Sequence, residues 1–163
     1  MIEMNVAGIA VDAGTRHPII LLRDGSERRQ LPIFVSPDQA KTIQAVLEGE
    51  KPGRPMTHDL IVNLLKAWDM TLQRVVIHSL RDNTFYAVMS VGKGEQKKEL
   101  DARPSDAIAV ALRVNAPIWV MEEVILDAAI PVDREADAAE TEAFHAFLSD
   151  ISPADFAERD RFI

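Results

Sequence analysis

The first part of the chain alternates between short apolar runs and turn residues, a pattern typical of a strand meander. Residues 2–12 are rich in Ile, Val and Met, and residues 17–23 contain the fully apolar run P-I-I-L-L. Asp24-Gly25 is a hairpin turn signal, because both residue types tolerate positive φ, and residues 29–35 supply a third apolar run. These runs predict three sequential antiparallel strands.

Two helices are predicted next. Residues 36–48 begin with S-P-D-Q, in which Ser caps the helix, Pro suits its first position and Gln reaches back to the cap; Gly49 ends the segment. In residues 57–68 the large apolar side chains recur at helical spacing, which predicts a second helix buried in the core. Those side chains are Leu60, Ile61, Leu64, Leu65 and Trp68.

The second half of the chain repeats the order of strands followed by a helix. Residues 73–81 and 84–91 predict a hairpin closed by Asp82-Asn83, and residues 96–101 predict a third, more polar strand. The segment 104–114 is so apolar that it predicts a helix buried nearly all round. Short elements complete this part: a buried strand at 117–121, and a strand or a helical turn at 122–126.

The last thirty residues form a helical tail of acidic character. Residues 133–140 are charged and alanine-rich, residues 141–148 place Phe144, Phe147 and Leu148 on one helix face, and residues 152–155 start a final short helix. Two arrangements are open: the apolar face docks on the body or on a neighbouring subunit, or the tail is a mobile arm. Docking is favoured, because an exposed face of this kind promotes association.

The fold class that follows is α/β (α+β). We predict mixed, largely antiparallel sheets of short strands with three or four helices packed on them. Residues 1–132 form one compact domain, and residues 133–163 form the acidic C-terminal helical tail.

The amino-acid composition limits the cellular location and the binding partners that can be expected. The chain of 163 residues contains no cysteine, which excludes disulfides and thiolate zinc sites and favours a reducing, cytoplasmic location. Its N-terminus does not resemble a signal peptide, and no apolar run approaches the roughly 20 residues of a membrane span, so no membrane partner is expected. Residues 127–163 hold 10 acidic and 3 basic residues, whereas residues 1–126 hold 16 and 15. The body is nearly neutral, so nucleic-acid binding should be weak.

One short pattern occurs twice. Arg-Pro, a hydroxyl residue and an Asp precede an apolar helix in residues 54–61 and again in residues 103–108. Helix capping is one explanation of both, since Pro, Ser, Thr and Asp all favour the first helical turn, and a functional role is compatible with it. A helix N-terminus is also an anion site, and His58 adds a group that titrates near neutrality. We therefore expect the two helix starts to lie together in space and to form a shared polar pocket.

Four segments of the chain resemble the bifunctional nuclease domain family of bacteria and plant organelles. They are R-P-M-T-H-D-L-I-V-N-L-L (54–65), V-V-I-H-S-L-R-D-N-T-F-Y-A (75–87), D-A-R-P-S-D-A-I-A-V-A-L-R (101–113) and A-P-I-W-V (116–120). The resemblance implies an α/β fold with mixed sheets, homo-oligomeric assembly and cleavage of RNA and DNA. It points to positions in two motifs: Arg54, Thr57, His58 and Asp59, and Asp101, Arg103, Ser105 and Asp106.

Phosphodiester hydrolysis needs an activated water and stabilisation of the phosphoryl oxygens. A metal-assisted site would use Asp59, Asp101 and Asp106 as ligands for Mg²⁺ or Mn²⁺, with Arg54 or Arg103 on the phosphate. A metal-free site would use His58 as general base and the arginines as electrophiles, with Thr57 and Ser105 binding substrate. The metal-assisted hydrolysis of RNA and single-stranded DNA is slightly favoured. The alternative is a non-enzymatic cytosolic oligomer that binds a small anion or a protein partner, which suits the charge distribution better.

Overall fold

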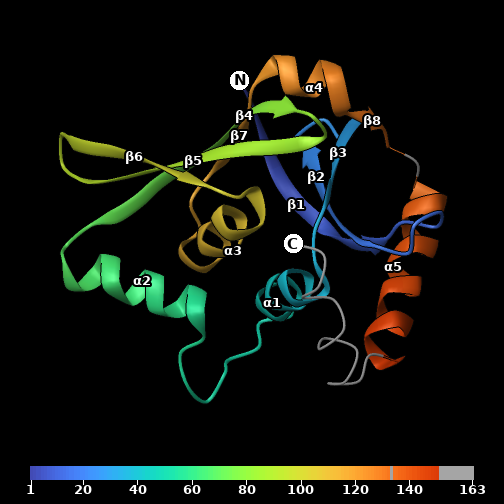
Figure 1. Ribbon diagram of the computed structural model, residues 1–163, viewed down its shortest axis with the longest axis horizontal. Helices are drawn as coiled ribbons and strands as arrows, with labels where there is room; N and C mark the ends of the chain where they lie inside the picture. The colour runs from blue at the N-terminus through green and yellow to red at the C-terminus, as the bar shows by residue number, and fades with distance from the viewer. Residues whose placement is uncertain (133, 151–163) are drawn as a thin grey trace.

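The structure, a computed structural model, describes residues 1–132 and 134–150. The strands in these residues form one sheet in the order β6-β5-β4-β7-β1-β2-β3-β8 (Figure 1). The strands are β1 (Ile2–Val11), β2 (Pro18–Asp24), β3 (Arg29–Phe34), β4 (Thr71–Arg81), β5 (Thr84–Lys93), β6 (Gln96–Ala102), β7 (Ile118–Val120) and β8 (Ile130–Pro131). The helices are α1 (Pro37–Leu47), α2 (Thr57–Ala67), α3 (Pro104–Val114), α4 (Glu122–Ala128) and α5 (Arg134–Asp150).

The sheet consists of two antiparallel halves joined by one short strand. β1, β2 and β3 form the predicted meander, and β4, β5 and β6 form the predicted hairpin with its third strand. β7 pairs antiparallel with β1, where Val120 lies opposite Ile2, and parallel with β4, where Val120 lies beside Ile77. The mixed, largely antiparallel fold class is therefore confirmed, with the described strands gathered into a single sheet.

Local sequence explains how the elements begin and turn. The capping box of α1 is present, because the Ser36 hydroxyl accepts from the backbone of Gln39 while the Gln39 side chain accepts from the backbone of Ser36. Asp82 and Asn83 both have positive φ, as a tight hairpin turn requires. The segment 122–126, for which strand and helix were both open, is helical.

The turn after β2 differs from the expectation. Positive φ occurs at Glu27 rather than at Asp24 or Gly25, and the loop spans residues 25–28. The Asp24 carboxylate organises this longer loop by accepting from the hydroxyl of Ser26 and from the backbone N–H of Arg28. An Asp at the start of a loop stabilises several geometries in this way, so Asp-Gly alone did not fix the turn length.

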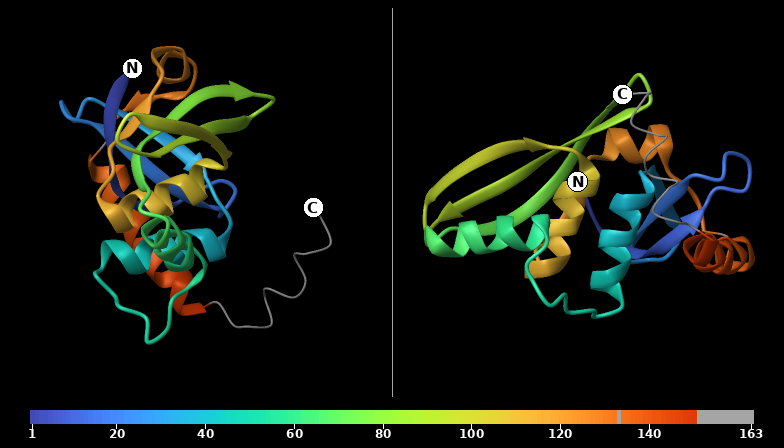
Figure 2. Two further views of the ribbon diagram at one scale, coloured as in Figure 1. Left: turned by 90° about the vertical axis from the view of Figure 1, so that its left-hand side faces the viewer. Right: turned by 60° about the horizontal axis from the view of Figure 1, so that its bottom comes forward.

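The apolar run of β2 is explained by burial on both faces of the sheet. Ile20 and Leu22 belong to the main core, whereas Ile19 and Leu21 form a smaller cluster with Ala10 on the other side. A strand covered on both faces has no need of polar alternation. Figure 2 shows α1, α2 and α3 gathered on one side of the sheet.

The acidic tail docks on the body as far as it is described. α5 packs against β1, and Phe144 is completely buried, while Phe147 and Leu148 are partly buried against the same core. The docked arrangement predicted for this face is confirmed over α5. The final short helix expected at 152–155 lies outside the described residues.

α2 is not the core helix that its spacing predicted. Only Val62 is buried, whereas Leu60 and Leu64 are each 53% exposed and Trp68 is 76% exposed. α2 lies against α3 and β4 on one side only, and its opposite side faces solvent. Helical spacing identifies an apolar face, but it does not say whether a neighbouring element covers that face.

No helix within the described part of the chain is long and apolar enough to span a membrane.

Candidate functional site

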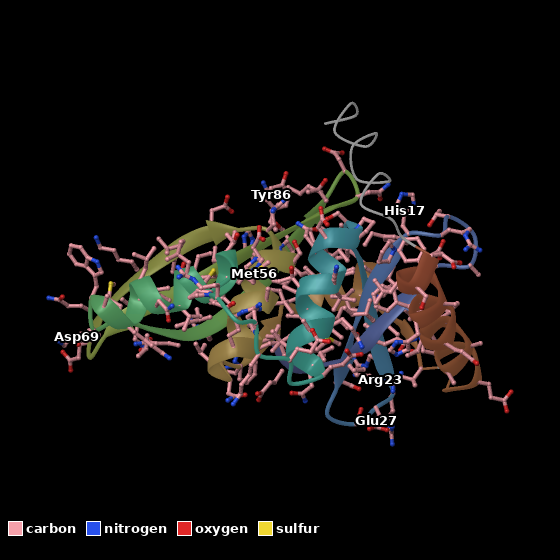
Figure 3. The ribbon with its side chains drawn as sticks, turned by 90° about the horizontal axis from the view of Figure 1, so that it is seen from below. His17, Arg23, Glu27, Met56, Asp69 and Tyr86 are labelled. Atoms are coloured by element: carbon pink, nitrogen blue, oxygen red, sulfur yellow. The ribbon has the colours of Figure 1, made fainter. Side chains whose placement is uncertain are left out.

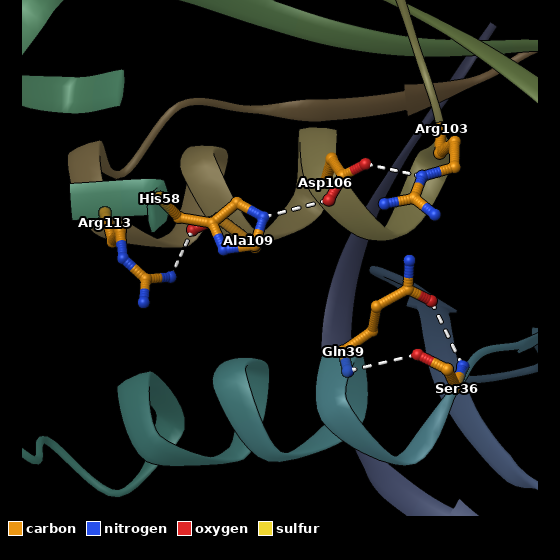
Figure 4. Close-up of polar contacts among 7 residues, drawn as sticks. All are labelled: Ser36, Gln39, His58, Arg103, Asp106, Ala109 and Arg113. Carbon is orange, nitrogen blue, oxygen red and sulfur yellow. Dashed lines mark hydrogen bonds and ion pairs between the residues drawn. The ribbon is translucent and has the colours of Figure 1, made fainter. Parts of the chain in front are cut away.

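The starts of α2 and α3 meet, as the repeated motif predicted. His58, in the first turn of α2, places its Nε2 atom 3.0 Å from Oδ1 of Asp106, in the first turn of α3. The other oxygen of Asp106, Oδ2, accepts a hydrogen bond of 2.7 Å from Nε of Arg103. Figure 4 shows His58, Asp106 and Arg103 following one another along α3. Residues 48 positions apart thus form one continuous polar chain.

The contacts among His58, Asp106 and Arg103 fix the protonation state of the Asp106 carboxylate. Burial raises the pKa of Asp106, but the hydrogen bonds from Arg103 and His58 outweigh it, so that the pKa lies below its ordinary value. Asp106 is therefore ionised at neutral pH and acts as an acceptor only. In the neutral form of His58 the proton therefore lies on Nε2 and the lone pair on Nδ1, for which the structure gives no partner among the described residues.

Asp59 stabilises the structure, although it belongs to the same repeated motif as Asp106. Its Oδ2 accepts from the backbone N–H of Met56 at 2.8 Å and closes the first turn of α2, while its Oδ1 accepts from Nε of Arg113 at 2.6 Å. The hydrogen bond from Arg113 is the main reason that the pKa of Asp59 is lowered. Asp59 is therefore occupied by helix capping and by its ion pair with Arg113, whereas Asp106 accepts from side chains only and is not a capping residue.

Arg113 is the residue that the motif analysis missed. Its side chain is only 10% exposed, binds Asp59, and also donates from Nη1 to the carbonyl oxygen of Ala109. A signal was present in the sequence, because Asp106 and Arg113 are seven residues apart and a seven-residue step returns to the same helix face. Two charged side chains on one face of an otherwise apolar helix indicate a partner segment that carries groups of complementary charge.

Asp59→Asn is expected to lower the free energy of unfolding at neutral pH by about 1 to 3 kcal/mol, because a largely buried guanidinium then lacks its carboxylate. Since the pKa of Asp59 is lowered by folding, its contribution is complete above the ordinary value of 3.8 and is lost as the pH falls through the folded-state value. Urea unfolding of parent and variant from neutral to acid pH measures this. The two curves should converge in acid, and a constant gap would contradict the assignment.

A hollow lies at the N-terminus of α3. It measures about 230 Å³ and brings together the end of β3, the start of α1, the β4–β5 turn and the start of α3. We call it the α3 hollow, and its lining is Ile33, Phe34, Val35, Gln39, Asn83, Thr84, Phe85, Arg103, Pro104 and Ser105. Ser105 is only 5% exposed, and no hydrogen bond of its hydroxyl is recorded among the described residues. A buried hydroxyl beside an Arg and a helix N-terminus is suited to binding an anion.

The remaining predicted residues make no side-chain hydrogen bond or ion pair with His58, Asp106 or Arg103 in the described ranges. Arg54 stands in the exposed loop between α1 and α2, Thr57 is exposed at the first position of α2, and Asp101 is exposed on β6. None of the three has a side-chain hydrogen bond or ion pair recorded in the described ranges.

The three predicted metal ligands do not form a ready-made cluster. In residues 1–132 and 134–150, no group of three or more His, Asp or Glu side chains is placed to hold a metal ion. Asp59 and Asp106 are engaged by arginines, and Asp101 lies on a different element. These residues therefore do not fit a preformed three-carboxylate site.

Comparison with known proteins shows the family to which the chain belongs. Residues 20–133 match the bifunctional nuclease domain, and the chain therefore belongs to that family. It is 39% identical over 162 residues to the uncharacterized protein Rv1829 of Mycobacterium tuberculosis, covering 94% of this chain and 97% of the relative. It is also 27% identical over 117 residues to Bifunctional nuclease 1 of Oryza sativa subsp. japonica. That match covers 69% of this chain and 35% of the rice protein, so it spans about a third of the plant sequence.

Proposed function

We propose that the chain is a nuclease that hydrolyses phosphodiester bonds in RNA and single-stranded DNA. Membership of the bifunctional nuclease domain family supports this reaction class. The observation that carries the proposal is the chain of contacts from Arg103 through Asp106 to His58, because it supplies an oriented base beside a cationic side chain.

The proposed roles follow from the geometry. Asp106 accepts from Nε2–H of His58, and Nδ1 takes a proton from the water that attacks phosphorus. As the new P–O bond forms, the bond to the leaving oxygen breaks, and that oxygen takes a proton from solvent. The outer N–H groups of Arg103, whose side chain is 71% exposed, donate to the phosphoryl oxygens, and Ser105 donates from within the α3 hollow.

The assistance of hydrolysis by Mg²⁺ or Mn²⁺ remains a prediction. Mg²⁺ in proteins is commonly held by one or two carboxylates together with substrate phosphates, so a preformed cluster of three ligands is not required for metal assistance. Asp106 is the carboxylate closest to the proposed reaction, and a bound ion would compete with Arg103 for it. The cytoplasmic location and the homo-oligomeric state also remain predictions.

The direct test is an assay with end-labelled RNA and single-stranded DNA in the presence of EDTA, Mg²⁺ or Mn²⁺. Arg103→Gln is expected to raise KM about tenfold, because one charge-assisted hydrogen bond to phosphate is worth roughly 1.5 kcal/mol. A contaminating nuclease would give the same KM in both preparations. Hydrolysis that is absent from all three conditions would reject the nuclease function, and hydrolysis in EDTA would reject the metal requirement.

One observation favours the non-enzymatic alternative, in which the chain binds a small anion. The α3 hollow offers such an anion a cationic side chain and a buried hydroxyl. In that case inorganic phosphate should raise the unfolding temperature of the parent but not of Ser105→Ala, and no nucleic acid should be cleaved. Phosphate-dependent stabilisation together with cleavage supports the nuclease.

A further inference from the structure

The most exposed tryptophan of the chain stands at the end of α2. Trp68 is 76% exposed and directly follows the last helical residue, Ala67. The helix turns Val62 towards the body and leaves Trp68 in solvent. An aromatic ring of this size exposed on a protein surface is typical of a binding site, because its burial by a ligand releases a large apolar area.

Lysines from the β5–β6 hairpin line a hollow together with Trp68. Trp68, Met70, Lys93, Glu95, Gln96, Lys97 and Lys98 line a hollow of about 680 Å³, here called the Trp68 hollow. Figure 3 labels Asp69, the residue after Trp68, at the far end of the molecule beside this hairpin. Aromatic and basic residues that are separate in the sequence are thus brought together by the fold.

The local structure holds the hollow in shape. Nζ of Lys93 lies 3.1 Å from Oδ2 of Asp69, which ties the hairpin to the end of α2. Gly92 permits the close approach of the two strands, because a Cβ atom at that position would overlap the carbonyl oxygen of Gln96. Lys97 and Lys98 have no acidic partner recorded among the described residues.

We propose that the Trp68 hollow binds an unpaired nucleobase of a single-stranded nucleic acid, with the base stacked on Trp68 and the flanking phosphates on Lys97 and Lys98. An indole face stacks on any base, and ammonium groups pair with phosphates without regard to sequence. A duplex presents no free base face to stack on the ring. This inference rests on the nucleic-acid substrate class of the proposed function.

The hollow is within reach of the candidate site. Trp68 follows His58 by ten residues of α2, which at 1.5 Å per residue amounts to about 15 Å along the helix axis. At 3.4 Å or more per nucleotide, about four nucleotides are enough to cover this distance. A strand that is bound at the hollow can therefore continue along α2 to His58 and Arg103.

A second copy of the chain is the alternative occupant of the same surface. Leu60 and Leu64 are exposed in line with Trp68, and such an apolar stripe also suits a subunit contact. The lining contains three lysines and one glutamate, and one of the lysines, Lys93, is paired with Asp69. Lys97 and Lys98, which have no acidic partner among the described residues, favour the polyanion.

The test measures binding of a fluorescein-labelled 12-nucleotide oligothymidylate to the full chain carrying His58→Ala, which keeps the oligonucleotide intact. The chain has two tryptophans, so Trp119→Phe makes Trp68 the only one. Binding should then quench tryptophan fluorescence. Trp68→Ala should weaken binding about tenfold, and Trp68→Phe should largely restore it.

The lysines are tested through the salt dependence of binding. Lys97→Gln combined with Lys98→Gln should reduce the slope of log affinity against log salt by about 1.4, since each phosphate contact on a single strand contributes about 0.7. The matched control is Arg28→Gln combined with Arg29→Gln, at the opposite end of the sheet from β6, which should leave the slope unchanged. Leu126→Ala, at a position 82% exposed on α4, is the control for Trp68→Ala.

Equal affinity in the parent and in Trp68→Ala overturns the inference, and so does a change in oligomer size caused by Trp68→Ala without a loss of affinity. Hydrolysis is measured separately in chains that retain His58. Binding that depends on Trp68 without any hydrolysis supports the hollow and rejects the nuclease function. Hydrolysis combined with unchanged binding in Trp68→Ala supports the nuclease and rejects the hollow.

Discussion

His58→Ala is expected to lower the rate of phosphodiester hydrolysis by about 10²- to 10⁴-fold, the usual contribution of a positioned general base. The structure gives the physical reason, because the ring is held by Asp106 at 3.0 Å and its Nδ1 lone pair is available to a water. The measurement is kcat on a labelled single strand under saturating conditions. His17→Ala, in the exposed loop after β1, is the matched control and should retain the parental rate.

Asp106→Asn tests the carboxylate that orients His58 while it leaves the base itself in place. An asparagine amide can donate to Nε2, which favours the tautomer with its proton on Nδ1 and removes the lone pair that the mechanism uses. We expect a loss of rate comparable to that of His58→Ala, with the circular dichroism spectrum unchanged. Asp127→Asn, on the exposed side of α4, is the control. Parental rates in both His58→Ala and Asp106→Asn would show that hydrolysis takes place elsewhere.

Phe144→Ala is expected to lower the free energy of unfolding by about 3 to 5 kcal/mol, the usual loss for a phenylalanine removed from a core. Phe144 is fully buried and attaches α5 to the sheet. For a chain of this size the melting temperature should fall by roughly 6 to 20 °C. His145→Ala, at the exposed neighbouring position on α5, should change it little.

Thermal unfolding followed by circular dichroism measures how much the docking of α5 contributes to stability. If Phe144→Ala leaves the melting temperature unchanged, α5 separates from the sheet without unfolding the rest, and the docked helix contributes nothing to stability. A lower melting temperature combined with a single cooperative transition shows that α5 and the sheet unfold together.

Much of the secondary structure could be predicted because the signals are local. The capping box at Ser36, the Asp82-Asn83 turn and the apolar run of β2 each depend on neighbouring residues only, and each corresponds to an element in the structure. The exposed face of α2 could not be predicted in this way. Whether Leu60 and Trp68 are covered depends on how far α2 and the β5–β6 hairpin extend from the body.

In the candidate site, too, some features could be predicted from local sequence and others depend on tertiary contacts. The repeated motif predicted that the two helix starts would lie together, but it named neither the contact between His58 and Asp106 nor any difference in role between Asp59 and Asp106. That difference is produced by tertiary contacts, since Arg113 reaches Asp59 and Arg103 reaches Asp106. Asp101 lies on β6, whereas Asp59 and Asp106 lie in the first turns of helices, and this placement likewise depends on the path of the strand and not on its sequence spacing.

The position of β7 has a consequence for the synthesis of the chain on the ribosome. This strand of three residues joins the two halves of the sheet, and it pairs Ile2 with Val120, residues at opposite ends of the domain. Until β7 has left the exit tunnel, β1 and β4 each present an unpaired edge, which is open to pairing with another nascent chain. The sheet is therefore completed late in translation, and chains that stop before residue 118 should be prone to aggregation.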